Sequence, residues 1–129
     1  MNQPRGDQLI LTLRGDGAST RALLADFFTE RGWTLAREDG TRIDYERGSR
    51  GRTILLGALA GGAFHLTAQL EVREGDHATD VVYRWGPGAG LVLGGTMGRQ
   101  RAMRVHGETA QALRERTERD GLLERSRTS

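Results

Sequence analysis

A long amphipathic stretch near the C-terminus constrains this chain more than any other feature. Residues 86–98 carry no charge, whereas residues 99–119 are rich in Arg and Glu. Small side chains let a neighbouring backbone approach closely, or leave a void where it does not. The stretch therefore predicts a long helix on a sheet, with either a tight contact or a cavity between them. The face that would meet the sheet consists mostly of small residues at helical spacing: Leu91, Gly95, Gly98, Ala102, Val105, Thr109 and Leu113.

The beginning of the chain predicts a strand followed by a helix. Residues 8–14 are rich in leucine and suit a strand buried on one or both faces. Asp16 or Ser19 can cap the next helix, and Gly32 is a natural residue at its C-terminal end. We expect the apolar face of this helix to pack on the sheet. That face contains Thr20, Leu23, Leu24, Phe27 and Phe28.

A first hairpin is predicted from residues 33–37 and 41–47. A three-residue turn at 38–40, with Gly40 in the left-handed conformation, would pair Leu35 with Ile43. That register would collect the apolar side chains of both strands on one face.

A second hairpin is predicted from residues 64–73 and 78–85, with a turn at Gly75 and Asp76. The alternation of apolar residues then pairs Leu70 with Val81 on the inner face. The open ends of this hairpin lie together, so two uncharged, glycine-rich stretches should converge at one end of the sheet. These stretches are residues 54–64 and 86–98.

The predicted fold is a single α+β domain over residues 8–121. It contains a mostly antiparallel sheet of about five strands, in the order β-α-β-β-β-β-α, with the long C-terminal helix on one face. This order resembles, in topology only, the helix-grip and TATA-box-binding-protein-like folds, and topology does not fix function. Residues 1–7 and 122–129 are expected to be flexible tails.

Composition narrows the function classes. The chain has no Cys, which excludes disulfides and thiolate chemistry, and its first residues do not resemble a secretory signal, so we expect a cytoplasmic protein. Glycine and polar residues interrupt the apolar run at 53–70, so no transmembrane span is expected. The three histidines lack metal-ligand spacing, and neither a metal nor another cofactor is expected. Acidic residues interleave with the arginines, which disfavours a nucleic-acid partner.

The residues at the converging end predict a binding site. We expect an apolar or amphipathic ligand between the sheet and the C-terminal helix, in a non-enzymatic binding domain. An acidic group on that ligand would meet Arg50, Arg99 or Arg101, particularly if the helix begins near Thr96; a start near Leu91 would leave the helix arginines on a solvated face. The predicted lining consists of Phe64, Tyr83, Trp85, Leu91, Gly95, Gly98, Ala102 and His106.

Two other functions fit the same residues. The uncharged segments 54–64 and 86–98 could form a docking surface for a partner protein, a second copy or a membrane surface. Alternatively, His106 with Tyr83 could perform acid–base chemistry in a small enzyme. A satisfied core histidine is the simpler interpretation of His106, since no carboxylate is placed by sequence to tune it.

Overall fold

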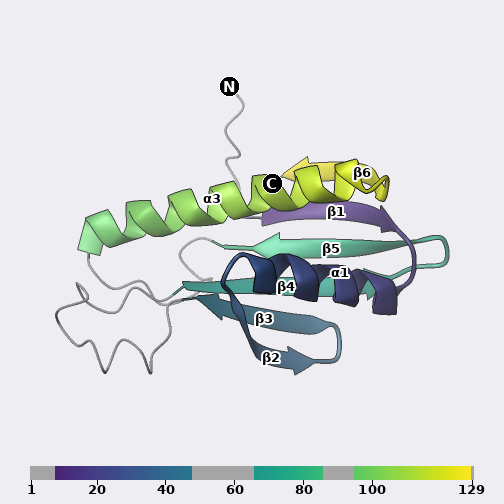
Figure 1. Cartoon of the computed structure of the whole chain (residues 1–129), viewed down its shortest axis with the longest axis horizontal. Helices are drawn as coiled ribbons and strands as arrows, with labels where there is room; N and C mark the ends of the chain where they lie inside the picture. Colours follow the sequence, from purple (N-terminus) through teal and green to yellow (C-terminus); the bar gives the residue numbers. More distant parts are fainter. Residues whose placement is uncertain (1–7, 48–65, 86–94, 129) are drawn as a thin grey trace.

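The computed structural model describes residues 8–47, 66–85 and 95–128. One antiparallel sheet of six strands, in the order β2-β3-β4-β5-β1-β6, runs through them (Figure 1). The predicted α+β class and the order β-α-β-β-β-β-α are confirmed, with one strand added. The elements are β1 (Gln8–Arg14), α1 (Gly17–Glu30), β2 (Thr34–Asp39), β3 (Arg42–Arg47), β4 (Leu66–Glu74), β5 (Ala78–Arg84), α3 (Gly95–Arg119) and β6 (Leu123–Thr128).

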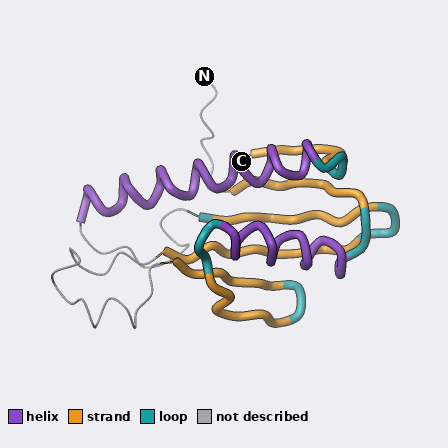
Figure 2. The backbone as a smooth tube through the Cα atoms, viewed as in Figure 1, coloured by secondary structure: helices purple, strands orange, loops and turns teal. Residues whose placement is uncertain are grey.

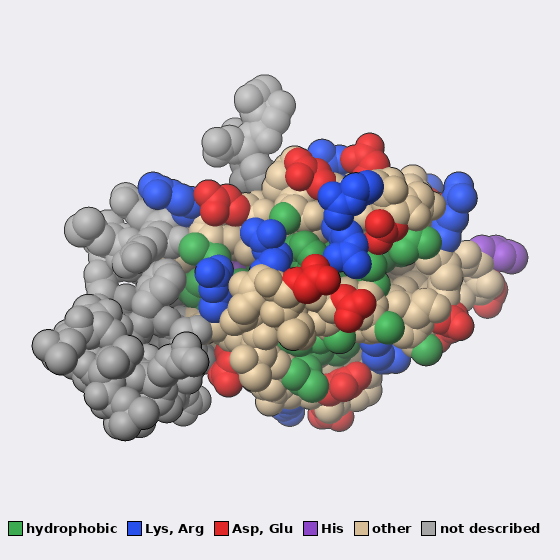
Figure 3. Space-filling model, viewed as in Figure 1, with side chains coloured by type: hydrophobic (Ala, Val, Ile, Leu, Met, Phe, Trp, Pro, Cys, Tyr) green, Lys and Arg blue, Asp and Glu red, His purple; other side chains and the backbone are tan. Residues whose placement is uncertain are grey.

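Both helices cover the same face of the sheet (Figure 2). In β1, β3, β4 and β5, most of the alternating residues that point to the helices are buried, and they form one core with the inner faces of α1 and α3. Among the described residues, the other face carries no helix, and most of its side chains are polar or charged. The placement of the long C-terminal helix on one face is therefore confirmed. On the helix side, acidic and basic side chains are interspersed over the described surface (Figure 3).

Helix α1 begins and ends where the sequence predicts. The Asp16 side chain accepts a hydrogen bond from the backbone N–H of Ser19 at 2.8 Å, which satisfies one of the free N–H groups of the first turn. This bond and a second one from the Ser19 hydroxyl lower the pKa of Asp16. Gly32, with φ of 89°, follows the last turn in the conformation that glycine adopts most easily.

The predicted register of the first hairpin is wrong. Asp39 pairs with Arg42, so the turn has two residues, Gly40 and Thr41, and Gly40 has φ of 62°. A register shift between Leu35 and Arg37 then places Leu35 opposite Tyr45. The turn is one residue shorter than predicted, and the bulge places one extra residue in β2 instead. Leu35 is 48% exposed, since β2 is an edge strand.

The predicted register of the second hairpin is wrong by two residues, although the inner face is correct. Leu70 pairs with Tyr83 and not with Val81, because the turn lies at Asp76 and His77 and the backbone N–H of Gly75 donates to the carbonyl of Ala78 at 2.8 Å. A shift of two preserves which face each side chain occupies. Phe64 and residues 54–64 lie outside the described residues.

The C-terminal tail was expected to be flexible, but residues 123–128 form β6. Gly121, with φ of 75°, ends α3, and the N–H of Leu122 donates to the carbonyl of Thr117. The chain then reverses and pairs antiparallel with β1. The physical reason is that β1 would otherwise be an edge with free backbone groups, and β6 satisfies them. The tail expected at 1–7 lies outside the described part of the chain.

Candidate functional site

A buried hydrogen bond joins α3 to the centre of the sheet. His106, on the inner face of α3, lies 2.8 Å through Nδ1 from the hydroxyl oxygen of Tyr83 on β5. Tyr83 is 0% exposed and His106 is 4% exposed. Sequence alternation directs Tyr83 inward on β5, and helical periodicity directs His106 toward it from α3. Both residues belong to the site predicted from the sequence, and the structure brings them into direct contact.

Aromatic rings surround the imidazole. The Trp85 ring stacks with His106 at a centroid distance of 6.5 Å and an interplanar angle of 12°, while the Trp33 ring lies 5.8 Å away, tilted by 43°. We call His106, Tyr83, Trp85 and Trp33 the His106 cluster. Phe28 of α1 contacts it through Trp33 and Tyr83. Trp33 directly precedes β2, and the sequence analysis assigned it to a hairpin face and not to this cluster.

The electrostatics of the cluster keep both polar groups neutral at pH 7. Burial lowers the pKa of His106 to about 4, because the charged imidazolium would be poorly solvated there. Burial also raises the pKa of the Tyr83 hydroxyl well above its usual range, although a hydrogen bond with Thr109 and the positive charge of Arg31 oppose part of this rise. A base with so low a pKa and a phenol that keeps its proton are poorly matched to proton transfer at neutral pH. The pair is suited to hold α3 on the sheet.

The other predicted site residues lie at different depths of the structure. Ala102 is buried on α3, one turn before His106. Gly95 and Gly98 belong to α3, whose described part is Gly95–Arg119. Residues 86–94 lie outside the described part, so the choice between a helix start near Leu91 and one near Thr96 stays a prediction, and the side chains of Arg99 and Arg101 also lie outside it. Leu91 and Arg50 also fall there.

A groove opens between α3 and the edge of the sheet, next to the His106 cluster. It has a volume of about 190 Å³. Trp85 belongs both to the cluster and to the groove wall, so the two features are continuous. The residues of the groove come from β1, from the end of β5, from α3 and from β6: Leu9, Trp85, Gly107, Ala110, Gln111, Arg114, Ser126, Arg127 and Thr128.

The chemistry of the groove is amphipathic. Leu9, Trp85 and Ala110 are buried and supply apolar surface. Arg114 lines the same groove, and its one ion pair within the described part of the chain is a half-exposed pair with Glu118, at 3.5 Å. Trp85 is among the predicted lining residues, whereas the contribution of β6 was not predicted, because residues 122–129 were expected to form a tail. The glycine after α3, at Gly121, was the one signal of a chain reversal there.

These features define the class of protein: a small α+β domain with a groove between its last helix and the edge of its sheet. Within the described residues, no group of acidic or histidine side chains is arranged to hold a metal ion. Neither described helix has the length and the apolar character needed to cross a membrane. The sequence matches no protein-family model and no curated protein.

Proposed function

We propose that this chain is a non-enzymatic binding domain that takes a small apolar or amphipathic molecule in the groove between α3 and the sheet edge. The groove itself carries this proposal, because concave surfaces with an apolar floor and a few polar groups are where proteins bind small ligands. Its volume of about 190 Å³ is smaller than the roughly 300–1,000 Å³ of drug-sized sites. A short aliphatic or aromatic ligand therefore fits best.

An acidic group on the ligand would complement the groove. Arg114 is the cation that lines it from α3, and its partner Glu118 lies four residues further along the same helix. Exposed pairs of this kind contribute little free energy, about 0.3–0.5 kcal/mol, so a ligand carboxylate can replace Glu118 at small cost. The acidic ligand group is thus assigned to Arg114, in addition to the arginines that the sequence analysis named.

The neutral, closed His106 cluster supports binding over catalysis. A proton-transfer site needs a group that changes protonation near the working pH and reaches the substrate. His106 is almost completely enclosed, and burial holds its pKa at about 4. We therefore assign to His106 the positioning of α3, which forms one wall of the groove.

Filling the groove tests this proposal. Gly107 lines the groove, and a Cβ atom added there meets no other atom within 4 Å. Gly107→Leu should therefore occupy the groove without strain and should strengthen the helix by about 1 kcal/mol. Octanoate binding, followed by Trp fluorescence and calorimetry, should weaken about tenfold or more in this variant. Glu108→Leu, at the next and exposed position of α3, is the matched control and should bind as the parent does.

Two further measurements make the result decisive. Arg114→Gln should weaken binding of octanoate and leave binding of the uncharged octanol unchanged. Native mass spectrometry of the protein from its own host should detect a small molecule that is lost on denaturation. Equal octanoate affinity in the parent and in Gly107→Leu would show that the groove is not the binding site.

A further inference from the structure

Strand β6 forms an edge of the sheet with unusual charge. It pairs with β1 on one side only, and β2 forms the opposite edge. Each edge strand carries one extra residue at a register shift, between Leu35 and Arg37 on β2 and at Glu124 on β6, and such a shift obstructs the addition of another strand at that point. On β6, residues 125–128 continue in regular register with residues 9–12 of β1. The regular part of the β6 edge is therefore residues 125–128, and the charge of this part distinguishes it.

Two arginines of β6 point to the helix-free face of the sheet and are exposed. Arg125 is paired with Thr12 and Arg127 with Ile10, whose side chains lie on that face. Over the described ranges 8–47, 66–85 and 95–128, neither arginine has a hydrogen bond or an ion pair with another side chain. The one acidic residue of β6, Glu124, is held by Arg14 at 3.3 Å. The edge thus presents two cations, two residues apart, whose charges are not compensated.

We propose that β6 binds an acidic, extended segment of a partner protein, which adds to the sheet as a seventh strand. Backbone hydrogen bonds along the edge would provide affinity, and side chains at alternate positions would provide specificity. Carboxylates two residues apart in the partner would lie opposite Arg125 and Arg127. The intervening side chains would fall on the helix side, beside the small hydroxyl residues Ser126 and Thr128.

The same charges disfavour a second copy of this chain as the partner. If β6 paired antiparallel with β6 of a second copy, the two sheets would become continuous. Side chains on the same face would then stand opposite each other. The registers with the largest overlap of β6 pair Arg125 with Arg125 or Arg125 with Arg127. Like charges directly opposite one another are destabilising. An acidic strand relieves this repulsion, whereas a copy of β6 increases it.

The partner strand would lie along the outer edge of β6 and the ligand in the groove, whose wall also includes residues 126–128. The two proposals share β6, but they rest on different observations and are tested with different probes. A fluorescein-labelled peptide of alternating glutamate and threonine is the probe, and a lysine–threonine peptide is its control. Fluorescence anisotropy should detect binding of the acidic peptide only. The amide NMR signals of residues 123–128 should shift, while those of β2 should not.

Charge reversal tests the residues. The double variant Arg125→Glu/Arg127→Glu should weaken binding of the acidic peptide about tenfold or more and should gain binding of the lysine peptide. Arg37→Glu, on the opposite edge strand, is the matched control and should bind as the parent does. Both variants replace exposed side chains, and circular dichroism checks that each is folded.

A backbone-blocked peptide separates strand addition from general charge attraction. N-methylation of alternate residues removes backbone donors and leaves the carboxylates, so it should abolish binding. If the methylated and unmethylated peptides bind equally, strand addition is overturned. Absence of binding by the acidic peptide, or a dimer that forms through β6, would also overturn the proposal. The role of the two arginines would then be to prevent unwanted strand pairing at this edge.

Discussion

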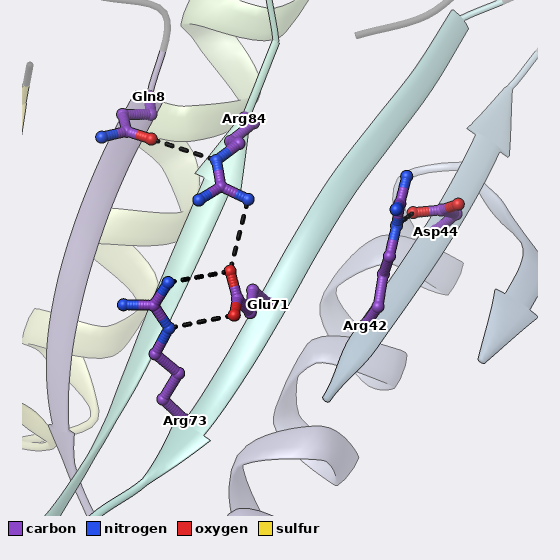
Figure 4. A network of polar contacts seen from close by, with 6 residues as sticks. All are labelled: Gln8, Arg42, Asp44, Glu71, Arg73 and Arg84. Carbon is purple, nitrogen blue, oxygen red and sulfur yellow. Dashed lines mark hydrogen bonds and ion pairs between the residues drawn. The ribbon is translucent and has the colours of Figure 1, made fainter. Parts of the chain in front are cut away.

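The two faces of one sheet have opposite chemistry, although the same strands build both. On β5, Tyr83 points to the helices and is completely buried, while the next residue, Arg84, points away and is exposed. The inner face is closed by α1 and α3 and holds the His106 cluster. The outer face is open to water and holds a network centred on Glu71 (Figure 4). Two neighbouring residues thus experience environments of very different dielectric constant.

The observed register of β4 and β5 brings oppositely charged side chains together on the outer face. The register predicted from the sequence, in which Leu70 pairs with Val81, would place Glu71 opposite Asp80, and two acidic side chains in that position repel each other. In the structure Arg73 pairs with Asp80, and Glu71 accepts two hydrogen bonds from Arg73, at 3.0 and 3.1 Å, and one from Arg84 at 3.3 Å. The hydrogen bond from Arg73 is the main reason that the pKa of Glu71 is lowered. Because water screens these charges, we expect their contribution to stability to be small.

The largest difference between the faces should appear when an inner aromatic side chain is removed. Phe28 is fully buried, stacks on Tyr45 at 4.7 Å and contacts Trp33 and Tyr83 edge-on. Phe28→Ala should lower the free energy of unfolding by about 3–5 kcal/mol, through lost burial and a residual cavity. Chemical denaturation measures this change. Leu35→Ala, at a half-exposed apolar position, should cost less than about 1 kcal/mol, and a similar loss in both variants would contradict the comparison.

The next largest effect should be a pH dependence that the inner face alone produces. The imidazole has a pKa of about 4 in the folded protein and about 6.5 when unfolded. As the pH falls below 6.5, the unfolded state takes up a proton that folded His106 does not, so the unfolded state is favoured. The free energy of unfolding should fall by about 3 kcal/mol in total as the pH decreases to 4. Stability from this group is complete only above pH 6.5.

A variant without a titratable group at position 106 provides the control for this pH effect. His106→Gln should be less stable than the parent at pH 7 but should lose the slope between pH 6.5 and 5. The pKa values of Asp16 and Glu71 are already low, so their contributions change mainly below this interval. Denaturation midpoints at several pH values measure the slope. An unchanged slope in the variant would mean that His106 is not the titrating group.

The smallest effect should come from the centre of the outer network. Glu71→Gln removes the charge that attracts Arg73 and Arg84 while keeping the size of the side chain. The free energy of unfolding should fall by less than about 1 kcal/mol, and high salt should reduce the difference further. Thermal denaturation at low and high salt checks both statements. A loss comparable to that of Phe28→Ala would mean that this open face is much less screened than its exposure indicates.

Sequence patterns predicted the parts of this fold that depend on local rules. Alternation on β4 and β5 assigned the inner and outer faces correctly, and the caps at Asp16 and Gly32 placed the ends of α1. Both hairpin registers were wrong, because the choice between turns at Gly40 or Gly75 involves small energies that pairing along the whole strand overrides. For the candidate site, the approach of His106 to Tyr83 followed from two periodicities, whereas the groove did not, because three of its nine lining residues come from β6.

The sequence by itself determined the secondary elements as far as the end of α3, the polarity of each sheet face and the inward direction of His106, since these follow from the period of side chains along a strand or helix. Only the tertiary structure decided that residues 123–128 form a strand. Their own sequence is charged and has no strong preference for a strand, but the unpaired edge of β1 and the turn at Gly121 bring backbone donors and acceptors together. That pairing creates both the groove beside Trp85 and the arginine edge.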